Sequence, residues 1–237
     1  MQNVFSKIES YTGAKIKIGI EIEFYAQKKY SINKLKKKLG QFDISEETGT
    51  NQYEIRLGPS TDYVHLIKQA TELQRIIKKD NDLILDPSPY YDEPSSGIHI
   101  HVNLINQDGY NLFEKHQGQE AKLLLHSIGG MLKTMKENLK HFSPSEKSLQ
   151  RYKGGMHNPS KICWGINNRT AAIRVPAEKD GDRRIEHRVP SSDCNINKAV
   201  NAILSGMLYG IISEINPGEK IYGNAFLDQY PYENIID

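Results

Sequence analysis

Three short segments of this chain alternate apolar residues with ionisable ones: residues 20–24, 98–102 and 184–189. Successive side chains of a β-strand point to opposite faces, so the alternation predicts three strands, each with one apolar face. The opposite faces would carry carboxylates in the first segment, imidazoles in the second, and arginines around a carboxylate in the third. Any fold of this chain must therefore cover one side of these strands with apolar groups and leave the other side strongly ionisable.

The apolar side predicts the core of the protein. Residues 53–57 show the same alternation, which adds a fourth strand. Elsewhere apolar residues recur at three- and four-residue steps, the helical period, and we expect helices at about residues 61–79, 118–140 and 195–213, with a shorter one at 32–39. Gly129 and Gly130 interrupt the second of these patterns. The strand residues expected to be buried beneath the helices are Ile20, Ile22, Phe24, Ile98, Ile100, Ile185 and Val189.

The ionisable side has two interpretations. A single strand of this kind is typical of a half-exposed sheet whose charged face meets water. Together the strands favour a site, because Glu21 and Glu23 would repel each other without a cation between them, and because His99 and His101 have the same spacing. Carboxylates with an imidazole suit Mg²⁺ or Mn²⁺, and arginines recognise phosphate and carboxylate groups. The combination predicts a metal and nucleotide site that also holds an anionic substrate.

Composition and motifs exclude several classes of protein. Lys and Arg total 31 against 29 Asp and Glu, a net charge of +2, so we expect neither nucleic acid nor an anionic membrane as a partner. No apolar run approaches the roughly 18 residues of a membrane span and no signal peptide is evident, which predicts a cytoplasmic protein. The chain has neither a G-x-x-x-x-G-K-[ST] nor a G-x-G-x-x-G motif, so ATP would be held through metals and arginines. Its length suits a single domain over residues 1–237.

Five motifs in order along the chain resemble those of one known family, the catalytic domain of glutamine synthetase and its relatives. They are GIEIEF at 19–24, EETGTNQYE at 46–54, SGIHIH at 96–101, NRTAAIRVP at 168–176 and RRIEHRVPSSDCNINKAVNAILSGMLYGI at 183–211. The resemblance implies an α+β fold in which a curved, mainly antiparallel sheet lines a funnel and helices pack on its convex face. It also implies ATP and two to three Mg²⁺ or Mn²⁺ ions as cofactors.

Carried over position by position, the resemblance implies a role for each candidate residue. The ion that orders the amino-acid substrate would be held by Glu23, Glu46 and Glu54, and the ion bound to the ATP phosphates by Glu21, His99 and Glu186. The other assignments are Arg174 and Arg184 to phosphate, His101 to ATP, Arg169 to the transferred phosphoryl group, and Arg188, Arg151 and Gly97 to the substrate. The residues expected to take part in catalysis are Arg169, Glu186, Arg188 and His157, the last standing where the family has a glutamate that helps to deprotonate ammonium.

The implied reaction is ATP-dependent amide formation through an acyl phosphate, but three features depart from the family. The 18 residues before Gly19 leave no room for an N-terminal β-grasp domain of about a hundred residues. Pro94 and Ser95 replace an Asn-Gly pair that contacts the substrate, and His157 cannot offer ammonium an anionic cage. We therefore expect a ligase that joins a small-molecule carboxylate, glutamate or an acid like it, to an amine or ammonia. The departures favour either an amine other than free ammonium or an acid other than glutamate itself. The ring assemblies of the family also imply a homo-oligomer.

Two alternatives remain open from the sequence. One is a non-catalytic relative that serves as a binding or assembly protein, although six retained metal-ligand positions argue against it. The other is a guanidino-kinase-like phosphotransferase, which would release ADP without forming an amide. Product analysis separates that second alternative from an amide-forming ligase.

Overall fold

The centre of the protein is an eight-stranded sheet, seen in a computed structural model that describes residues 2–153, 158–176, 180–227 and 230–236. The strands are β1 (Lys15–Ala26), β2 (Asp43–Glu46), β3 (Gln52–Ser60), β4 (Leu83–Ile84), β5 (Ile98–Ile105), β6 (Trp164–Ile166), β7 (Ile173–Val175) and β8 (Ile185–His187). Their order is β2-β3-β1-β5-β8-β7-β6, and β4 pairs with β1 beside this path. Among the paired strands of the described residues, β6 and β7 run parallel and the others antiparallel.

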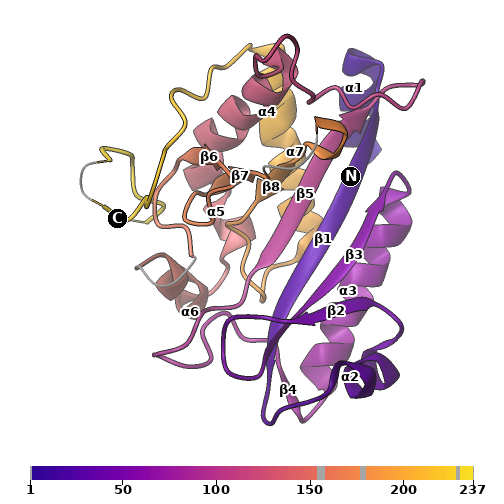
Figure 1. Cartoon of the computed structure of the whole chain (residues 1–237), viewed down its shortest axis with the longest axis vertical. Helices are drawn as coiled ribbons and strands as arrows, with labels where there is room; N and C mark the ends of the chain where they lie inside the picture. The colour runs from indigo at the N-terminus through magenta and orange to yellow at the C-terminus, as the bar shows by residue number, and fades with distance from the viewer. Residues whose placement is uncertain (1, 154–157, 177–179, 228–229, 237) are drawn as a thin grey trace.

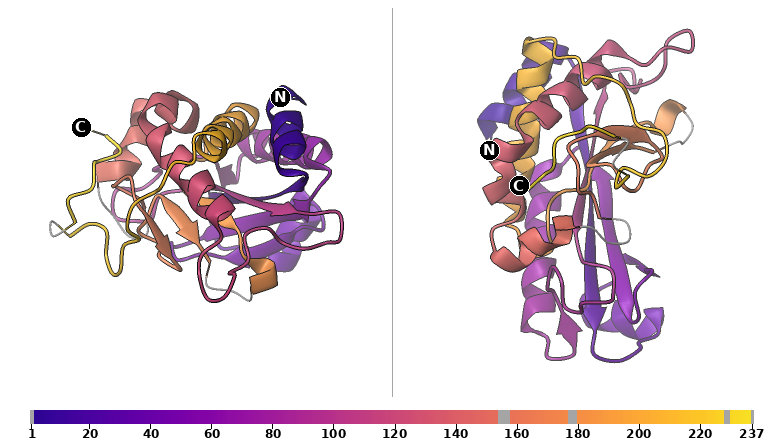
Figure 2. Two further views of the ribbon diagram at one scale, coloured as in Figure 1. Left: turned by 90° about the horizontal axis from the view of Figure 1, so that it is seen from above. Right: turned by 90° about the vertical axis from the view of Figure 1, so that its left-hand side faces the viewer.

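Most of the helices cover one side of this sheet (Figure 1). The helices are α1 (Gln2–Thr12), α2 (Ile32–Leu39), α3 (Tyr63–Lys79), α4 (Lys122–Lys133), α5 (Met135–Phe142), α6 (Glu146–Leu149) and α7 (Ile196–Ile212), with the 3₁₀ helices η1 (Gln150–Lys153) and η2 (Asp180–Asp182). In the right-hand view of Figure 2, α1, α3, α4, α5 and α7 all lie on the same side of the strands. This open, mainly antiparallel sheet with helices on one face confirms the predicted α+β class.

The apolar faces of the strands form the core, as the alternation predicts. The strand residues expected to be buried, Ile20, Ile22, Phe24, Ile98, Ile100, Ile185 and Val189, are each at most 1% exposed. His187 lies on the same face of β8, where its ring packs 4.8 Å from the ring of Phe142 in α5. Since neighbours along a strand point to opposite faces, burial of these residues turns the glutamates, histidines and arginines between them to the other side of the sheet.

The predicted helices agree with the structure except at one break. Helices α3 and α7 lie within 61–79 and 195–213, and α2 coincides with 32–39. Asp62 and Asn195 cap the first turns of α3 and α7, each accepting a hydrogen bond from a backbone N–H three residues on. The segment expected as one helix at 118–140 is instead two, α4 and α5, because the chain leaves the helical conformation at Thr134.

Several short elements were not expected from the sequence, among them the helices described next. Helix α1 buries Phe5 and Ile8, and the ring of Phe5 stacks on Tyr63 with centroids 3.8 Å apart. The segment 143–161, for which no helix was predicted, contains α6 and η1. Both are short amphipathic stretches whose few apolar residues gain their burial from packing on other elements, so the sequence pattern alone is weak. Among the described residues, no helix has the length and apolar character needed to cross a membrane.

Candidate functional site

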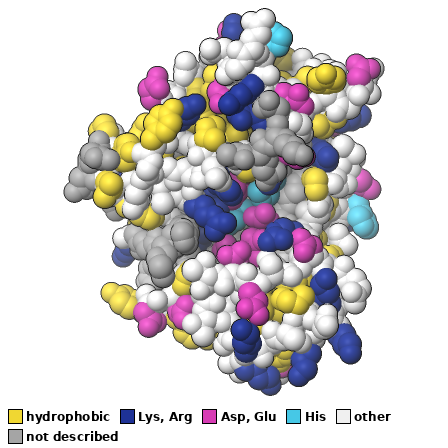
Figure 3. Space-filling model, in the orientation of Figure 1, with side chains coloured by type: hydrophobic (Ala, Val, Ile, Leu, Met, Phe, Trp, Pro, Cys, Tyr) yellow, Lys and Arg dark blue, Asp and Glu magenta, His cyan; other side chains and the backbone are white. Residues whose placement is uncertain are grey.

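A cavity of about 150 Å³ opens on the face of the sheet that the helices leave uncovered. Histidine, acidic and basic side chains gather around a hollow near the middle of this face (Figure 3). Eight residues predicted for the site line the cavity: Glu21, Glu23, Glu54, His99, Arg169, Arg174, Glu186 and Arg188. The structure therefore brings together side chains from five motifs spread over most of the chain.

The register of the sheet explains this convergence. In β1, Glu21 pairs with His99 of β5 and Glu23 pairs with Glu54 of β3. On the other side of β5, His101 pairs with Glu186 of β8. Paired residues of adjacent strands project to the same face with short separations between their side chains. The alternating pattern and the strand order together place these groups in one cluster.

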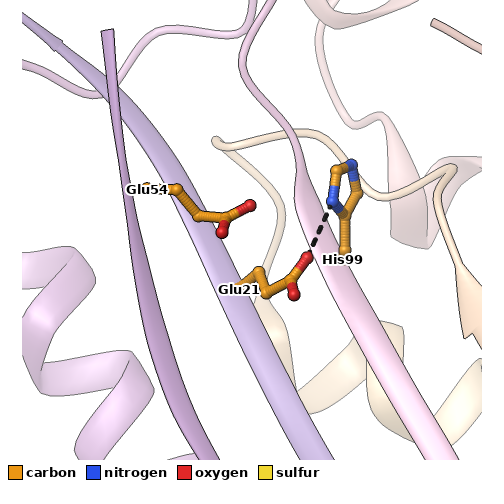
Figure 4. A group of neighbouring side chains, drawn as sticks. All are labelled: Glu21, Glu54 and His99. Carbon is orange, nitrogen blue, oxygen red and sulfur yellow. Dashed lines mark hydrogen bonds and ion pairs between the residues drawn. The ribbon is translucent and has the colours of Figure 1, made fainter. Parts of the chain in front are cut away.

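Glu21 lies at the centre of the cluster and contacts both histidines. Its Oε2 is 3.2 Å from His99 Nδ1, and its Oε1 is 3.1 Å from His101 Nε2. Figure 4 shows Glu21, Glu54 and His99 projecting from three neighbouring strands, with their polar ends directed into the same space. One ligand atom from each of these three lies within 4.8 Å of the others, and the same holds for Glu21, His101 and Glu186. Two groups of possible metal ligands thus share Glu21.

Burial and like charges give the carboxyl groups of the cluster unequal acidity. Burial, followed by the charges of Glu21 and Glu23, raises the pKa of Glu54 to about 8. Burial also disfavours ionisation of Glu21, but hydrogen bonds with the two histidines outweigh it and hold the pKa of that carboxyl well below its usual range. Concentrated negative charge of this kind, presented by carboxylate oxygens, suits a divalent cation.

Glu186 is a buried anion held by two arginines. Its side chain is 1% exposed, Arg174 Nη1 donates to Oε2 at 2.7 Å, and Arg188 Nη1 donates to Oε1. Burial favours the neutral acid, yet the positive charge of Arg188 and of the groups around it lowers the pKa of Glu186 to about 2. Glu186 therefore stays ionised at neutral pH and orients both guanidinium groups at the wall of the cavity.

Glu46, which the sequence predicts for the site, is not among the residues that line this cavity. In β2, Glu46 pairs with Tyr53, whose side chain points to the helix-covered face, while Glu54 points to the opposite face. Glu46 is exposed and lies 3.4 Å from Lys29 Nζ. The next residue, Glu47, lines the cavity instead, where burial and the charge of Glu23 raise its pKa above the usual range. The two glutamates are adjacent in sequence, and the choice between them as a cavity residue depends on where β2 ends.

Gly97 and Arg151, which the sequence also predicts for the site, are not among the residues that line this cavity. Gly97 donates its backbone N–H to Glu23 Oε2 at 2.6 Å, next to the cluster. Arg151 is 3% exposed and donates from Nε to Ser95 Oγ at 2.9 Å and from Nη1 to the carbonyl of Val189 at 3.0 Å. His157 lies outside the described residues.

His101 and Arg184 line a second cavity of about 330 Å³. Arg184 Nε donates to His101 Nδ1 at 3.1 Å, so the two residues predicted to contact ATP are direct neighbours. Glu21 and Arg56 line both this cavity and the first. The second cavity therefore adjoins the acidic cluster.

Sequence reasoning missed several lining residues, including Gln52 and Arg56. Both lie on β3, on the same face as Glu54, because they are two positions before and after it. Arg56 already lies within the predicted strand at 53–57, and extending the alternation by one residue towards the N-terminus would have identified Gln52. Asn158 also lines the cavity, and no pattern in the sequence distinguished it.

Known proteins resemble this chain over most of its length. The family described as glutamine synthetase, catalytic domain, matches residues 35–234. Gamma-glutamylputrescine synthetase PuuA of Escherichia coli (strain K12) is 30% identical over 184 residues, which is 76% of this chain and 39% of that protein. A glutamine synthetase of Pyrococcus horikoshii is 37% identical over 150 residues, which is 63% of this chain and 33% of that protein.

A solved structure described as "Apo GmaS without ligand" shares the fold, with a TM-score of 0.77 at 19% sequence identity over 98% of this chain and 62% of that one. The matched regions amount to 39% or less of the two curated relatives, so this chain spans well under half of their length. The family match nevertheless extends from within α2 to residue 234. With the strand order and the cavity described above, it establishes that this chain belongs to the glutamine synthetase catalytic-domain family.

Proposed function

We propose that this chain is an ATP-dependent carboxylate–amine ligase. The observation that supports the proposal best is the convergence of carboxylates, a histidine and arginines on one cavity, beside a second cavity that carries His101 and Arg184. Transfer of a phosphoryl group needs positive charge around the moving phosphate, and both cavities border on the same cluster. Membership of the glutamine synthetase catalytic-domain family also supports a ligase function.

The carboxylates and His99 fit divalent cations. Oxygen ligands with one imidazole suit Mg²⁺ or Mn²⁺. Burial raises the pKa of Glu54, and so does the negative charge of Glu21 and Glu23, which a cation would neutralise. We assign Glu21, His99 and Glu186 to one ion and Glu23, Glu47 and Glu54 to a second, with Glu47 taking the place first given to Glu46. When bound, such ions neutralise phosphate oxygens during the transfer.

The second cavity is the proposed nucleotide site. His101 and Arg184 would contact ATP there, with Arg174 directed to its phosphates from the first cavity. The acid would enter from the opposite side, where a wider cavity of about 820 Å³ is lined by Arg151 and shares Ser95 and Asn158 with the first. In this arrangement the acid and the γ-phosphate meet within the acidic cluster.

The proposed chemistry has two steps. A carboxylate oxygen of the acid forms a bond to the γ-phosphorus of ATP, and the bond from that phosphorus to the β–γ bridging oxygen breaks, releasing ADP. The nitrogen of a neutral amine then attacks the carbonyl carbon of the acyl phosphate, phosphate leaves with the electrons of the broken C–O bond, and the nitrogen loses a proton. Arg169 and Arg174 would offset the charge on the transferred group, and Arg188 would orient the acid.

The proposed acid is glutamate or a close analogue, and the proposed amine is an organic amine. The name of the Escherichia coli relative describes a γ-glutamyl compound of putrescine, whereas the archaeal relatives are named glutamine synthetases. His157 remains a predicted base for the amine. A homo-oligomer and a cytoplasmic location also remain predictions.

ADP release from Mg·ATP by the purified chain tests the proposal, with glutamate and other carboxylates offered in combination with ammonium, methylamine and diamines. We expect release that requires both a carboxylate and an amine, with an amide identified by mass spectrometry. Glu54→Gln, which keeps the shape of the side chain and removes its charge, should abolish turnover while leaving the protein folded. ADP formed without amide would indicate a phosphotransferase, and binding of Mg·ATP without turnover would indicate a non-catalytic relative.

A further inference from the structure

Two segments far apart in the sequence form neighbouring parts of the cavity wall and are tied together beneath it. Glu47 and Thr48 belong to the turn between β2 and β3, and Pro94 and Ser95 belong to the segment before β5. Neither segment is part of a helix or an extended strand, so other contacts must fix their separation. Those contacts come mainly from the side chain of Gln52, the first residue of β3.

Gln52 is 3% exposed and uses both ends of its amide. Its Oε1 accepts the backbone N–H of Gly49 at 3.0 Å, and its Nε2 donates to the carbonyl of Ser95 at 3.0 Å. One side chain thus bonds to the backbone of both wall segments. A buried polar group without its partner costs about 1–3 kcal/mol, so these two bonds hold the segments firmly.

Further contacts close the same junction. Tyr25 Oη donates to the carbonyl of Pro94 at 2.7 Å, and the carboxylate of Glu93 accepts the N–H of Thr50 at 3.0 Å. Gly49 sits between them with no space for a side chain, because a Cβ there would lie 2.2 Å from Tyr25 Oη and 2.8 Å from Gln52 Oε1. The junction is therefore tightly packed, and a change at Gln52 would move the wall segments relative to each other.

We propose that Gln52 is a positioning residue, which sets the separation of Glu47 from Ser95 and Gly97 and thereby the geometry of the acid-binding and metal-binding side of the cavity. The second cavity, proposed for ATP, is lined by other residues and does not include Gln52. The inference rests on the proposed function for the identity of the ligands. Its physical basis, the double hydrogen bond of one buried amide, does not depend on that function.

The test compares Gln52→Leu with Gln74→Leu in the full chain. Gln74 is also a buried glutamine that donates to two backbone carbonyls, those of Ser192 and Cys194, but it lies on α3 on the helix-covered side. The two substitutions remove similar bonds, so a general loss of stability should be alike in both. Tyr25→Phe, which removes only the bond to Pro94, is a milder second variant should Gln52→Leu fold poorly.

Kinetic constants and Mn²⁺ titration by calorimetry are the measurements. We expect Gln52→Leu to raise the KM for the acid and the dissociation constant for Mn²⁺ about tenfold, with the KM for ATP changed less than about twofold. Tyr25→Phe should raise the same two constants about threefold, and Gln74→Leu should leave them unchanged. Equal changes in all three constants, or no change at Gln52 beyond that at Gln74, would overturn the proposal.

The Mn²⁺ titration distinguishes failure of the proposed ligase function from failure of the proposed role of Gln52. If the wild-type chain turns over no carboxylate, the proposed ligase function fails, and the Mn²⁺ titration then decides the role of Gln52 alone. Weaker Mn²⁺ binding in Gln52→Leu than in Gln74→Leu would support it, and equal binding would refute it.

Discussion

Which of two adjacent glutamates enters the cavity is decided at the point where β2 ends. Glu46 shares a face with Tyr53 and is exposed at the sheet edge, whereas Glu47 lines the cavity near Glu23. Glu47→Gln should therefore raise the Mn²⁺ concentration for half-maximal ADP release by at least about tenfold. Glu46→Gln, the matched substitution, should change it less than about twofold, because its ion pair with Lys29 is exposed. The reverse ranking would show that the sequence-based choice of Glu46 was right.

The histidine on the covered face of β8 makes stability depend on pH. Burial lowers the pKa of His187 to about 3, from 6.5 in an unfolded chain. Between these values the unfolded chain binds a proton that the folded chain does not, so stability falls as pH decreases from about 6.5 towards 3, by up to about 5 kcal/mol from this group. Urea unfolding of wild type and His187→Met at pH 7 and pH 4.5 measures the effect. We expect the variant to lose less stability than wild type on acidification, and equal losses would refute the assignment.

At the scale of elements, the contact between α4 and α7 explains the presence of Gly130 in α4, one of the two glycines that interrupt the helical pattern of the sequence. A Cβ on Gly130 would lie 2.1 Å from the carbonyl oxygen of Gly206 and 2.4 Å from the backbone nitrogen of Gly210. The two helices thus approach backbone to backbone. The Gly129-Gly130 pair weakens the intrinsic helical tendency of α4, but its lack of side chains allows this packing.

Gly210→Ala should consequently destabilise the protein, although alanine is the better helix former. Its Cβ would lie 2.1 Å from the carbonyl oxygen of His126, so α4 and α7 would have to separate, at a cost of about 1–3 kcal/mol. Ser205→Ala, at an exposed position of the same helix, should change stability by less than about 0.5 kcal/mol. Thermal or urea unfolding of both variants provides the comparison. A Gly210→Ala protein as stable as wild type would mean that the helices are not in close contact.

For the whole molecule, the adjoining cavities predict that nucleotide and metal stabilise the fold together. Mn·ATP at about 100 times its dissociation constant should stabilise the protein by about 2.7 kcal/mol and raise Tm by about 5–10 °C. Arg184→Gln, which alters the second cavity, should reduce this shift while keeping the shift caused by Mn²⁺ alone. Differential scanning fluorimetry measures the Tm of both proteins with Mn²⁺ alone, with ATP alone and with the two together. If Mn²⁺ alone no longer raised the Tm of Arg184→Gln, the metal would bind in the second cavity and not in the first, contrary to the proposal.

The sequence by itself determined the class of fold and predicted eight of the residues that line the first cavity. Strict alternation identified which residues of β1, β5 and β8 are buried and which face the cavity, because the two faces of a strand follow from local geometry. The helical period located α2, α3 and α7 for the same reason. The resemblance to the family is borne out by the match over residues 35–234, which contains four of the five motifs.

Only the tertiary structure decided which side chains meet. The exclusion of Glu46 depends on the register of β2 against β3, and the role inferred for Gln52 depends on a segment 43 positions away. The burial of Phe5 in α1 depends on Tyr63, which stacks on it. Such contacts join residues distant in sequence, and their energy comes from packing and hydrogen bonds that no local pattern contains. Local geometry thus fixed the faces of the strands, and long-range packing fixed the cavity between them.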